Sequence, residues 1–370
     1  MVTHKQEKTI WSRVHVDPFF CFIIAILLVF SALIIWSASG QDCNMMEHKI
    51  FQITIGIGVM MLMAQIPPRI YERWSPYLYI CSLAFLIVVG IFGHISKGAQ
   101  RWIDLGVIRF QPSEIAKIAV PLIVARCVNR DRCPPSTLNI IGILILIFIP
   151  TLLVAVQPDL GTAILIACSG CFVLFLSGMS WTFVVVAGLV ISSCIPILWY
   201  FFMHDYQRNR IKILLSPESD PLGAGYHIIQ SKIAIGSGGF PGKGWLLGTQ
   251  SQLEFLPERH TDFIFSVLAE EFGFFGVVFL LLLYVLLVIR GLVMASQAQT
   301  TFGRVMAGGM MLVFFIYVFV NIGMVSGLLP VVGVPLPMIS YGGSALIVLM
   351  AGFGVIMSIH THRNMLSKNL

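Results

Sequence analysis

Asp262 is a carboxylate at a sharp boundary between polar and apolar sequence. It ends the polar stretch 254–262 and is followed at once by a long apolar run, so we expect it at the outer surface of a membrane. A carboxylate that is partly desolvated yet reachable from outside is suited to act as a general base. The alternative is a helix cap, in which Thr261 or Asp262 bonds free backbone N–H groups. Position alone favours the cap.

Glu270 and Glu271 lie further along the same apolar run. The spacing of four between Asp262, Ser266 and Glu270 places these residues on one broad face of a helix. A glutamate that faces lipid is costly, so at least one of the two should face the helix bundle or a water-filled cavity. A structural hydrogen bond to a neighbouring helix is the alternative.

Glu114 and Lys117 begin another apolar run, three residues apart. Their spacing lets them pair on one face of a helix, and Pro112 suits the first turn of that helix. Desolvation offsets much of the attraction within a buried ion pair, so a purely structural pair would gain little in a membrane. We therefore favour a pair that lines a cavity.

Positive side chains gather on the side expected to face outward, against the usual bias. Arginine pairs with phosphate through a planar fork and lysine acts as a point charge, so together they fit an anionic headgroup such as a diphosphate. The glycine-rich stretch 236–244 allows close approach of backbone to an anion. Nearby acids allow the alternative of a solvated loop with balanced charge. The positive residues are Lys97, Arg101, Arg109, Arg208, Arg210, Lys243 and Arg259.

Two segments rich in turn-forming residues carry further polar groups. Asp159 lies in 157–161, a tight turn for which turn chemistry alone accounts. The uncharged segment 330–344 contains three prolines and three glycines. It is either a rigid loop or a re-entrant segment, whose irregular backbone must be buried in protein or line a cavity. In the second case Ser340 and Tyr341 offer hydroxyl groups.

The elements that must position these residues are membrane helices. Of the 370 residues, 57% are hydrophobic and 11% are charged, and the mean hydropathy is +0.90. A soluble domain usually carries about 25% charged residues, so lipid must cover most of this surface. We find no basic-aromatic pattern that favours nucleic acid as a partner.

The fold expected is an all-α, polytopic membrane protein. Residues 1–370 form one unit, with 204–261 as a long outer loop. The distribution of Lys and Arg places both termini in the cytoplasm. About ten segments are apolar enough to span the bilayer, and they run over 18–36, 50–66, 76–93, 111–128, 138–156, 161–178, 181–203, 263–289, 305–329 and 344–360.

At these segments the sequence resembles the shape, elongation, division and sporulation (SEDS) family, and within it the members that act in cell elongation. The resemblance covers nearly the whole chain without an important departure. The motifs that carry it are Arg101-Trp-Ile-Asp-Leu-Gly with Phe110-Gln-Pro-Ser-Glu-Ile-Ala-Lys117, Gln157-Pro-Asp-Leu-Gly-Thr162, Phe255-Leu-Pro-Glu-Arg-His-Thr-Asp-Phe-Ile-Phe265 with Glu270-Glu-Phe-Gly273, and Pro335-Leu-Pro-Met-Ile-Ser-Tyr-Gly-Gly-Ser344.

The resemblance implies a peptidoglycan glycosyltransferase that polymerises lipid II at the periplasmic face of the bacterial inner membrane. The essential aspartate of the family matches Asp262, and this match favours the base over the cap. The family's charged pair matches Glu114 and Lys117, its outer arginine matches Arg101, and its turn aspartate matches Asp159.

An inverting displacement needs a base but no protein nucleophile, which agrees with one prominent carboxylate at the surface. We expect Lys117 and the outer positives Arg101, Arg210 and Lys243 to hold the diphosphate of the substrate, with Ser340 as a further contact. A divalent cation, Mg²⁺ or Mn²⁺, is a candidate cofactor without assigned ligands.

The resemblance also implies partners, and two other functions stay open. The partners are lipid II, the growing glycan strand, a class B penicillin-binding protein that crosslinks new strands, and other proteins of the elongation complex. A lipid II flippase is one alternative, because charges within spans also line transport paths. A scaffold that only recruits the crosslinking enzyme is the other.

Overall fold

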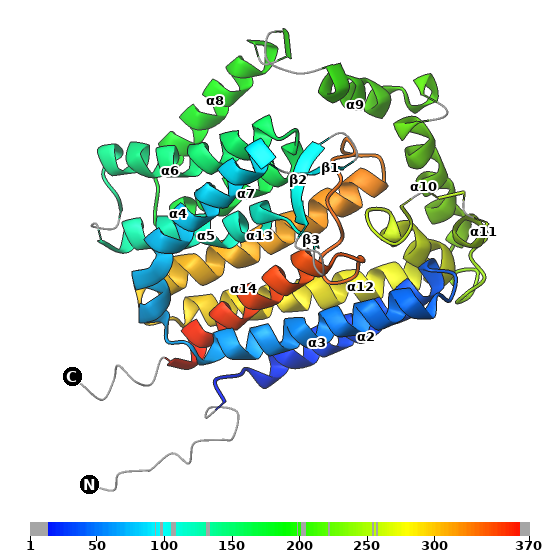
Figure 1. Cartoon of the computed structure of the whole chain (residues 1–370), viewed down its shortest axis with the longest axis horizontal. Helices are drawn as coiled ribbons and strands as arrows, with labels where there is room; N and C mark the ends of the chain where they lie inside the picture. The colour runs from blue at the N-terminus through cyan, green and yellow to red at the C-terminus, as the bar shows by residue number, and fades with distance from the viewer. Residues whose placement is uncertain are drawn as a thin grey trace, which may run out of the picture.

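The structure is a computed structural model, and it describes residues 14–362 apart from 93, 97–98, 105–108, 131–133, 198, 201–204, 221–222, 254 and 257. The described chain is a bundle of long helices (Figure 1), so the expected all-α membrane class is confirmed. Each expected span corresponds to a helix. These helices are α2 (Pro18–Ala38), α3 (Cys43–Gln65), α4 (Pro68–Phe92), α5 (Pro112–Arg130), α6 (Thr137–Val156), α7 (Leu160–Leu176), α8 (Trp181–Ile197), α12 (Ile264–Ser296), α13 (Thr301–Val325) and α14 (Gly343–Thr361).

Helix α13 lies at the centre of this bundle and packs against α12, α7 and α5. Around it, α3 packs on α14, and α6 packs on α7. Among the described helices, six are long and apolar enough to cross a membrane by themselves, namely α2, α4, α6, α12, α13 and α14, and α7 is apolar but shorter. Helix α5 carries Glu114 and Lys117, so it depends on its neighbours to shield them from lipid.

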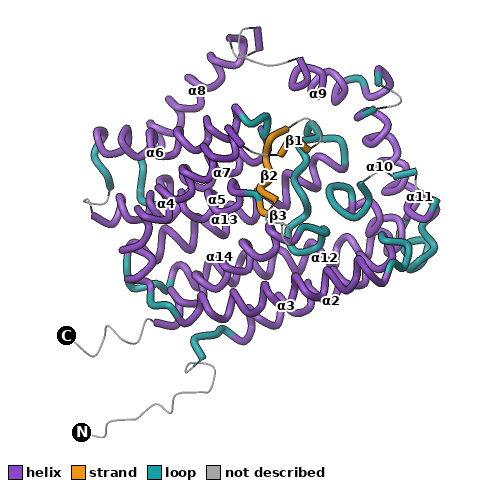
Figure 2. The backbone as a smooth tube through the Cα atoms, viewed as in Figure 1, coloured by secondary structure: helices purple, strands orange, loops and turns teal. Residues whose placement is uncertain are grey.

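The long segment 204–261 is folded rather than a plain loop. It contains α9 (Asp205–Leu215), the 3₁₀ turn η2 (Pro217–Ser219), α10 (Ala224–Gly238) and α11 (Thr249–Gln252). Helix α10 packs against α12. Between α4 and α5 the chain forms a small antiparallel sheet of β1 (His94–Ser96), β2 (Ala99–Asp104) and β3 (Arg109–Phe110), which the sequence did not predict. Figure 2 shows these strands as a small patch beside the helices.

Helix α12 is interrupted near its start, and a neighbouring loop repairs the break. Gly273 has φ +61° inside the helix, so the carbonyl groups before it lose their helical partners. The backbone N–H groups of Lys243 and Gly244 donate to the carbonyl oxygens of Glu270 and Glu271, each at 3.0 Å. A methyl group at Gly242 would lie 2.1 Å from the Glu271 carbonyl oxygen, so only glycine fits there.

This packing changes the interpretation of the glycine-rich stretch 236–244. The sequence suggested that its backbone approaches an anion. In the structure its tight turn instead faces the backbone of α12, and its N–H groups are bonded there. Close packing against the broken helix therefore explains Gly238 and Gly242.

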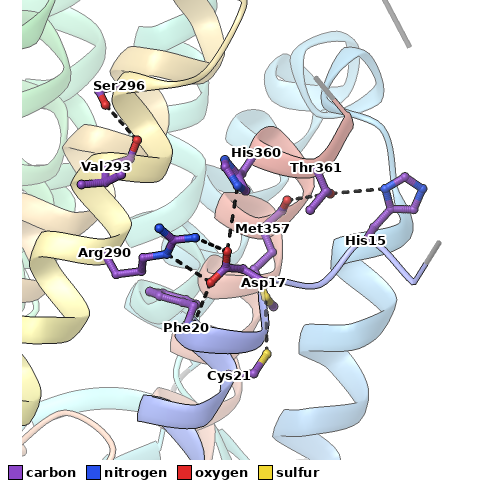
Figure 3. Close-up of polar contacts among 10 residues, drawn as sticks. All are labelled: His15, Asp17, Phe20, Cys21, Arg290, Val293, Ser296, Met357, His360 and Thr361. Atoms are coloured by element: carbon purple, nitrogen blue, oxygen red, sulfur yellow. Dashed lines mark hydrogen bonds and ion pairs between the residues drawn. The ribbon is translucent and has the colours of Figure 1, made fainter. Parts of the chain in front are cut away.

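The other end of α12 is tied to α2 and α14 by a buried acid (Figure 3). The Asp17 side chain caps α2 by accepting from the N–H of Phe20 at 2.8 Å. The Nε of Arg290, on α12, donates to Asp17 Oδ1 at 3.2 Å, and His360 Nε2, on α14, lies 3.9 Å from Asp17 Oδ2. Three helices therefore meet at one carboxylate.

Two histidines beside this carboxylate join the two ends of the described chain. The rings of His15 and His362 stack with their centroids 3.9 Å apart. His15, just before α2, and His362, just after α14, thus lie at the same end of the bundle.

We predict that Asp17→Asn destabilises the protein at neutral pH by roughly 2 kcal/mol, because it removes a charged hydrogen bond and keeps the helix cap. Burial raises the pKa of Asp17, but the bonds and charges of Arg290, Phe20 and His360 lower it further, so the net pKa lies below the ordinary value. The ionised Asp17 side chain therefore contributes fully to the stability of the fold above its ordinary pKa of about 3.9. This contribution is lost as the pH falls through the lowered pKa of the folded protein.

Thermal unfolding of the detergent-purified protein measures this prediction. The gap in melting temperature between wild type and Asp17→Asn should be wide at pH 7 and should close on acidification. Asp42→Asn is the matched control, because Asp42 also caps a helix but is exposed. An equal loss in both variants, or a gap that does not change with pH, would contradict the assignment.

Candidate active site

Asp262 lies on the turn that leads into α12, one residue before the helix cap position. The cap residue is Phe263, whose side chain cannot bond backbone N–H groups. The turn is closed by the backbone instead, since the N–H groups of Thr261 and Phe263 both donate to the carbonyl oxygen of Glu258, at 3.1 and 3.4 Å. The Asp262 side chain is half-buried. The residue at the cap position itself therefore makes no side-chain cap bond.

The turn is held by hydrogen bonds from helix α13 and from the segment 334–341. The Asn321 side chain, on α13, donates to the Asp262 carbonyl oxygen at 3.0 Å. The Ser340 hydroxyl donates to the Thr261 carbonyl oxygen at 2.6 Å. The N–H of Tyr341 donates to the His260 carbonyl oxygen at 2.8 Å. Three consecutive carbonyl groups of the turn are thus fixed.

Glu114 and Lys117 form the ion pair that their spacing predicts. Lys117 Nζ lies 2.8 Å from Glu114 Oε1, and both side chains are almost completely buried. The same ammonium lies 3.4 Å from the Tyr317 hydroxyl and 4.6 Å from the centre of the Tyr317 ring. Tyr317 therefore gives the lysine a second polar contact and a cation–π contact.

One face of α13 brings this pair and Asp262 into the same region. Tyr317 and Asn321 are four residues apart, which is about one helical turn of 5.4 Å. Tyr317 contacts Lys117, and Asn321 bonds the backbone of Asp262. The Asp262 carboxylate is also close enough to act electrostatically on Tyr317.

The ion pair lines a cavity of about 50 Å³, as the sequence predicted. Its polar end consists of Glu114, Lys117 and Tyr317. The remaining wall is apolar and comes mainly from α13 and α14, with Phe314 and Phe353 among its members. A charged end beside an apolar wall suits a molecule with an anionic headgroup and a hydrocarbon chain.

Asp159 serves the local fold. Its side chain caps α7 by accepting from the N–H of Thr162 at 3.3 Å, and it accepts from the Gln111 side chain at 3.0 Å. Gln111 directly precedes α5, so this contact fixes the helix that carries Glu114. Turn chemistry, the simpler of the two interpretations, thus describes what the structure shows at Asp159.

Two residues expected to bind substrate are engaged within the protein. Lys243 Nζ lies 2.7 Å from Glu270 Oε1. The Ser340 hydroxyl donates to the Thr261 carbonyl oxygen and accepts from the N–H of Leu336 at 2.7 Å. Burial of a polar group favours such internal bonds. The structure therefore gives both side chains a structural role that the sequence did not reveal.

Arg101 and Arg210 lie on elements that connect the spans, β2 and α9. Arg210 lies on α9, which packs on η2 and α10 and stands away from α5 in Figure 1. Arg101 lies on β2, which lies beside α4 and α5, and its side chain is outside what the structure describes. Lys97 is outside the described residues.

Glu270 and Glu271 have structural hydrogen bonds, the alternative that the sequence left open. The Glu270 carboxylate is fully buried and accepts from the N–H groups of Gln250 and Ser251, at 2.9 and 3.3 Å. Glu271 accepts from the hydroxyl of Ser37 on α2. These acids fix α11 and α2 against the broken part of α12.

The sequence missed Tyr317 and Asn321. Their signal was present, because they are polar residues one turn apart in the otherwise apolar stretch 305–325 of α13. Within the described ranges, no three His, Cys, Asp or Glu side chains are grouped closely enough to hold a metal ion. The structure therefore assigns no ligands to the candidate divalent cation.

Comparison with known proteins places this arrangement in context. Residues 17–365 match the FtsW, RodA and SpoVE family, described as cell cycle proteins. The chain is 70% identical over 370 residues to the peptidoglycan glycosyltransferase MrdB of Escherichia coli K12, and the match covers 100% of both chains.

Solved structures share the fold. A chain from a peptidoglycan synthase complex that coordinates polymerization and crosslinking superposes with a TM-score of 0.83 at 33% identity, over 94% of this chain and 98% of that one. The rod shape-determining protein RodA of Thermus thermophilus superposes with a TM-score of 0.72 at 28% identity, over 94% and 97%.

We predict strong coupling between Glu114 and Lys117 in stability. Either Glu114→Gln or Lys117→Met leaves one buried charge without its partner, which costs roughly 3–5 kcal/mol. The double variant removes both charges, so it should be destabilised by clearly less than the sum of the single changes. Thermal unfolding of the four proteins in one detergent measures the cycle, and additive losses would show that the pair does not interact.

Proposed function

Since the chain belongs to the FtsW, RodA and SpoVE family and is a peptidoglycan glycosyltransferase, we propose that it joins lipid II into β-1,4-linked strands with Asp262 as the general base. The observation that carries this role is the half-buried Asp262 carboxylate, which lies on a turn fixed by three hydrogen bonds. Helix α13 contacts both this turn and Lys117, which lines the cavity.

In the proposed step the acceptor is lipid II, with a free 4-hydroxyl on its N-acetylglucosamine. Its oxygen forms a bond to C1 of the N-acetylmuramic acid that ends the growing strand. Asp262 accepts the hydroxyl proton as this bond forms. The bond from C1 to the undecaprenyl diphosphate breaks, and its electron pair leaves with the diphosphate. Attack opposite the α-linked leaving group gives the β linkage in one displacement.

Lys117 supports the leaving diphosphate in this proposal. It is the buried cation at the polar end of the cavity, where low dielectric strengthens its attraction for an anion. The apolar wall formed by α13 and α14 accommodates part of the undecaprenyl chain. We propose that Arg101 and Arg210 meet the diphosphate or the sugars from outside. A divalent cation, Mg²⁺ or Mn²⁺, would add its charge while bound to the diphosphate.

The protein is a multi-pass protein of the bacterial inner membrane. We propose that both termini are cytoplasmic and that Asp262 faces the periplasm. Asp262 precedes α12, while Arg290, which bonds Asp17, lies near the other end of that helix. About 26 residues at 1.5 Å each separate these ends by roughly 40 Å, which is the thickness of a bilayer with its headgroups.

We also propose that a class B penicillin-binding protein works beside this chain and crosslinks its product, as part of the elongation complex. The likeness to a chain of a peptidoglycan synthase complex that coordinates polymerization and crosslinking supports this partner. The glycan polymerase and the transpeptidase would then act on the same strand in turn.

We predict that Asp262→Asn lowers glycan synthesis by about 10²–10⁴-fold, the range in which general bases contribute. The assay is polymerisation of labelled lipid II by the purified protein with and without its transpeptidase. Asp262→Glu should keep part of the activity, because it keeps a carboxylate. Asp42→Asn, an exposed acid at the start of α3, serves as the control.

The same preparation separates the competing functions. Near wild-type strand synthesis by a folded Asp262→Asn protein would rule out the base. Movement of lipid II across sealed liposomes by wild type, without synthesis in detergent, would instead favour a flippase. Neither activity in wild type would favour a scaffold.

A further inference from the structure

The segment 334–341 is an irregular stretch of chain whose carbonyl groups are bonded by four different helices. Side chains donate to it from α2 (Ser31 to Ile339, 2.9 Å), from α12 (Tyr284 to Pro337, 2.6 Å) and from α13 (Asn321 to Val334, 2.6 Å). From α3, Lys49 Nζ donates to the carbonyl oxygens of Met338 and Ser340, at 3.4 and 2.9 Å. Irregular backbone at membrane depth requires such partners.

This segment also supports the turn that carries Asp262. Ser340 and Tyr341 bond the carbonyl oxygens of Thr261 and His260. Asn321 uses one side-chain amide to hold both Asp262 and Val334, so it joins the turn and the segment at a common point. The location of Asp262 therefore depends on where 334–341 is held.

Lys49 is the unusual member of this network. Its side chain has no exposed surface, and no carboxylate pairs with it in the described part of the chain. A buried lysine amino group loses much hydration free energy, and in this position it donates to two buried carbonyl groups of an irregular backbone. Lys49 therefore serves the backbone of 334–341 rather than a charged partner.

The geometry offers another explanation for Lys49. Its ammonium bonds the carbonyl groups two residues apart, at Met338 and Ser340, and the Ser340 hydroxyl bonds Thr261. Lys49, on α3, thus fixes Ser340, whose side chain bonds the turn that carries Asp262. A site that must hold a base in place within a fraction of an ångström needs such a second layer of support.

We propose that Lys49 is a positioning residue of the glycosyltransferase, which holds Asp262 in place through 334–341, with Asn321 as the second anchor. The inference rests on the proposed role of Asp262 as the base. It assigns to Lys49 an effect on turnover rather than on substrate affinity, because Lys49 lies behind the segment and bonds only its backbone.

The test is Lys49→Met, which keeps the length of the side chain and removes its charge and donors. We expect kcat for lipid II polymerisation to fall by about 10–100-fold, as for a misplaced catalytic group, with KM within about twofold of wild type. The melting temperature should fall, because the carbonyl groups of Met338 and Ser340 lose their side-chain donor. Lys232→Met is the control, because Lys232 is exposed on α10 and no hydrogen bond from it to 334–341 is found among the described residues.

Hydrogen exchange gives a second measurement that does not depend on activity. The N–H groups of Thr261 and Phe263, which bond Glu258, should exchange about tenfold faster in Lys49→Met than in wild type. Amides of α6 should be unchanged. Ser31→Ala, which removes only the bond to Ile339, should show a smaller loss of kcat, and Ser82→Ala, a buried serine bonded within its own helix, should show none.

The outcomes separate the two proposals. Wild-type kcat and wild-type exchange in Lys49→Met would overturn the positioning role. A rise in KM as large as the fall in kcat would overturn it as well, since the defect would then lie in substrate binding. If Lys49→Met loosens the turn while Asp262→Asn remains active, the base assignment fails and the anchoring of the turn stands. Ser31→Ala gives the same comparison if Lys49→Met does not fold.

Discussion

In the membrane interior every polar backbone group must find its partner within the protein, and the site depends on that constraint. Two stretches depart from regular helix at depth, the break in α12 at Gly273 and the segment 334–341. At the break, a glycine turn supplies the missing N–H donors. At 334–341, side chains from four helices supply hydroxyl and N–H donors to the backbone carbonyl groups. Both repairs lie close in sequence or in space to Asp262.

The constraint sorts the charged residues into two groups. Asp17 with Arg290, and Glu270 with Lys243, are engaged in ion pairs that join helices. Their geometry accounts for them without a ligand. Glu114 and Lys117 also pair, but they do so on the wall of a cavity. Asp262 is half-buried on a fixed turn.

Helix α13 links the two parts of this site. Tyr317 contacts the lysine of the ion pair, and Asn321 bonds the turn that carries the proposed base. Since both lie on one helix, these two contacts are spaced by about one helical turn. This arrangement lets a helix that is buried against its neighbours fix a reaction geometry at the membrane surface.

Composition and apolar run length were sufficient to predict the helices. Each expected span has a counterpart, because a segment in lipid has few alternatives to helix. The i,i+3 spacing of Glu114 and Lys117 likewise predicted their pairing, since neighbours on one helix face need no tertiary information. The motifs pointed to the family and to Asp262 before any contact was known.

Only the tertiary structure decided which polar residues are used within the protein. Lys243 and Ser340 looked available in the sequence, yet one pairs with Glu270 and the other bonds Thr261. Lys49 was not among the candidate residues, yet it bonds the segment that supports the Asp262 turn. Their partners are far away in the sequence, and no local spacing encodes such pairs. The sequence by itself determined where helices run and which acid stands at the surface, and packing determined what holds that acid in place.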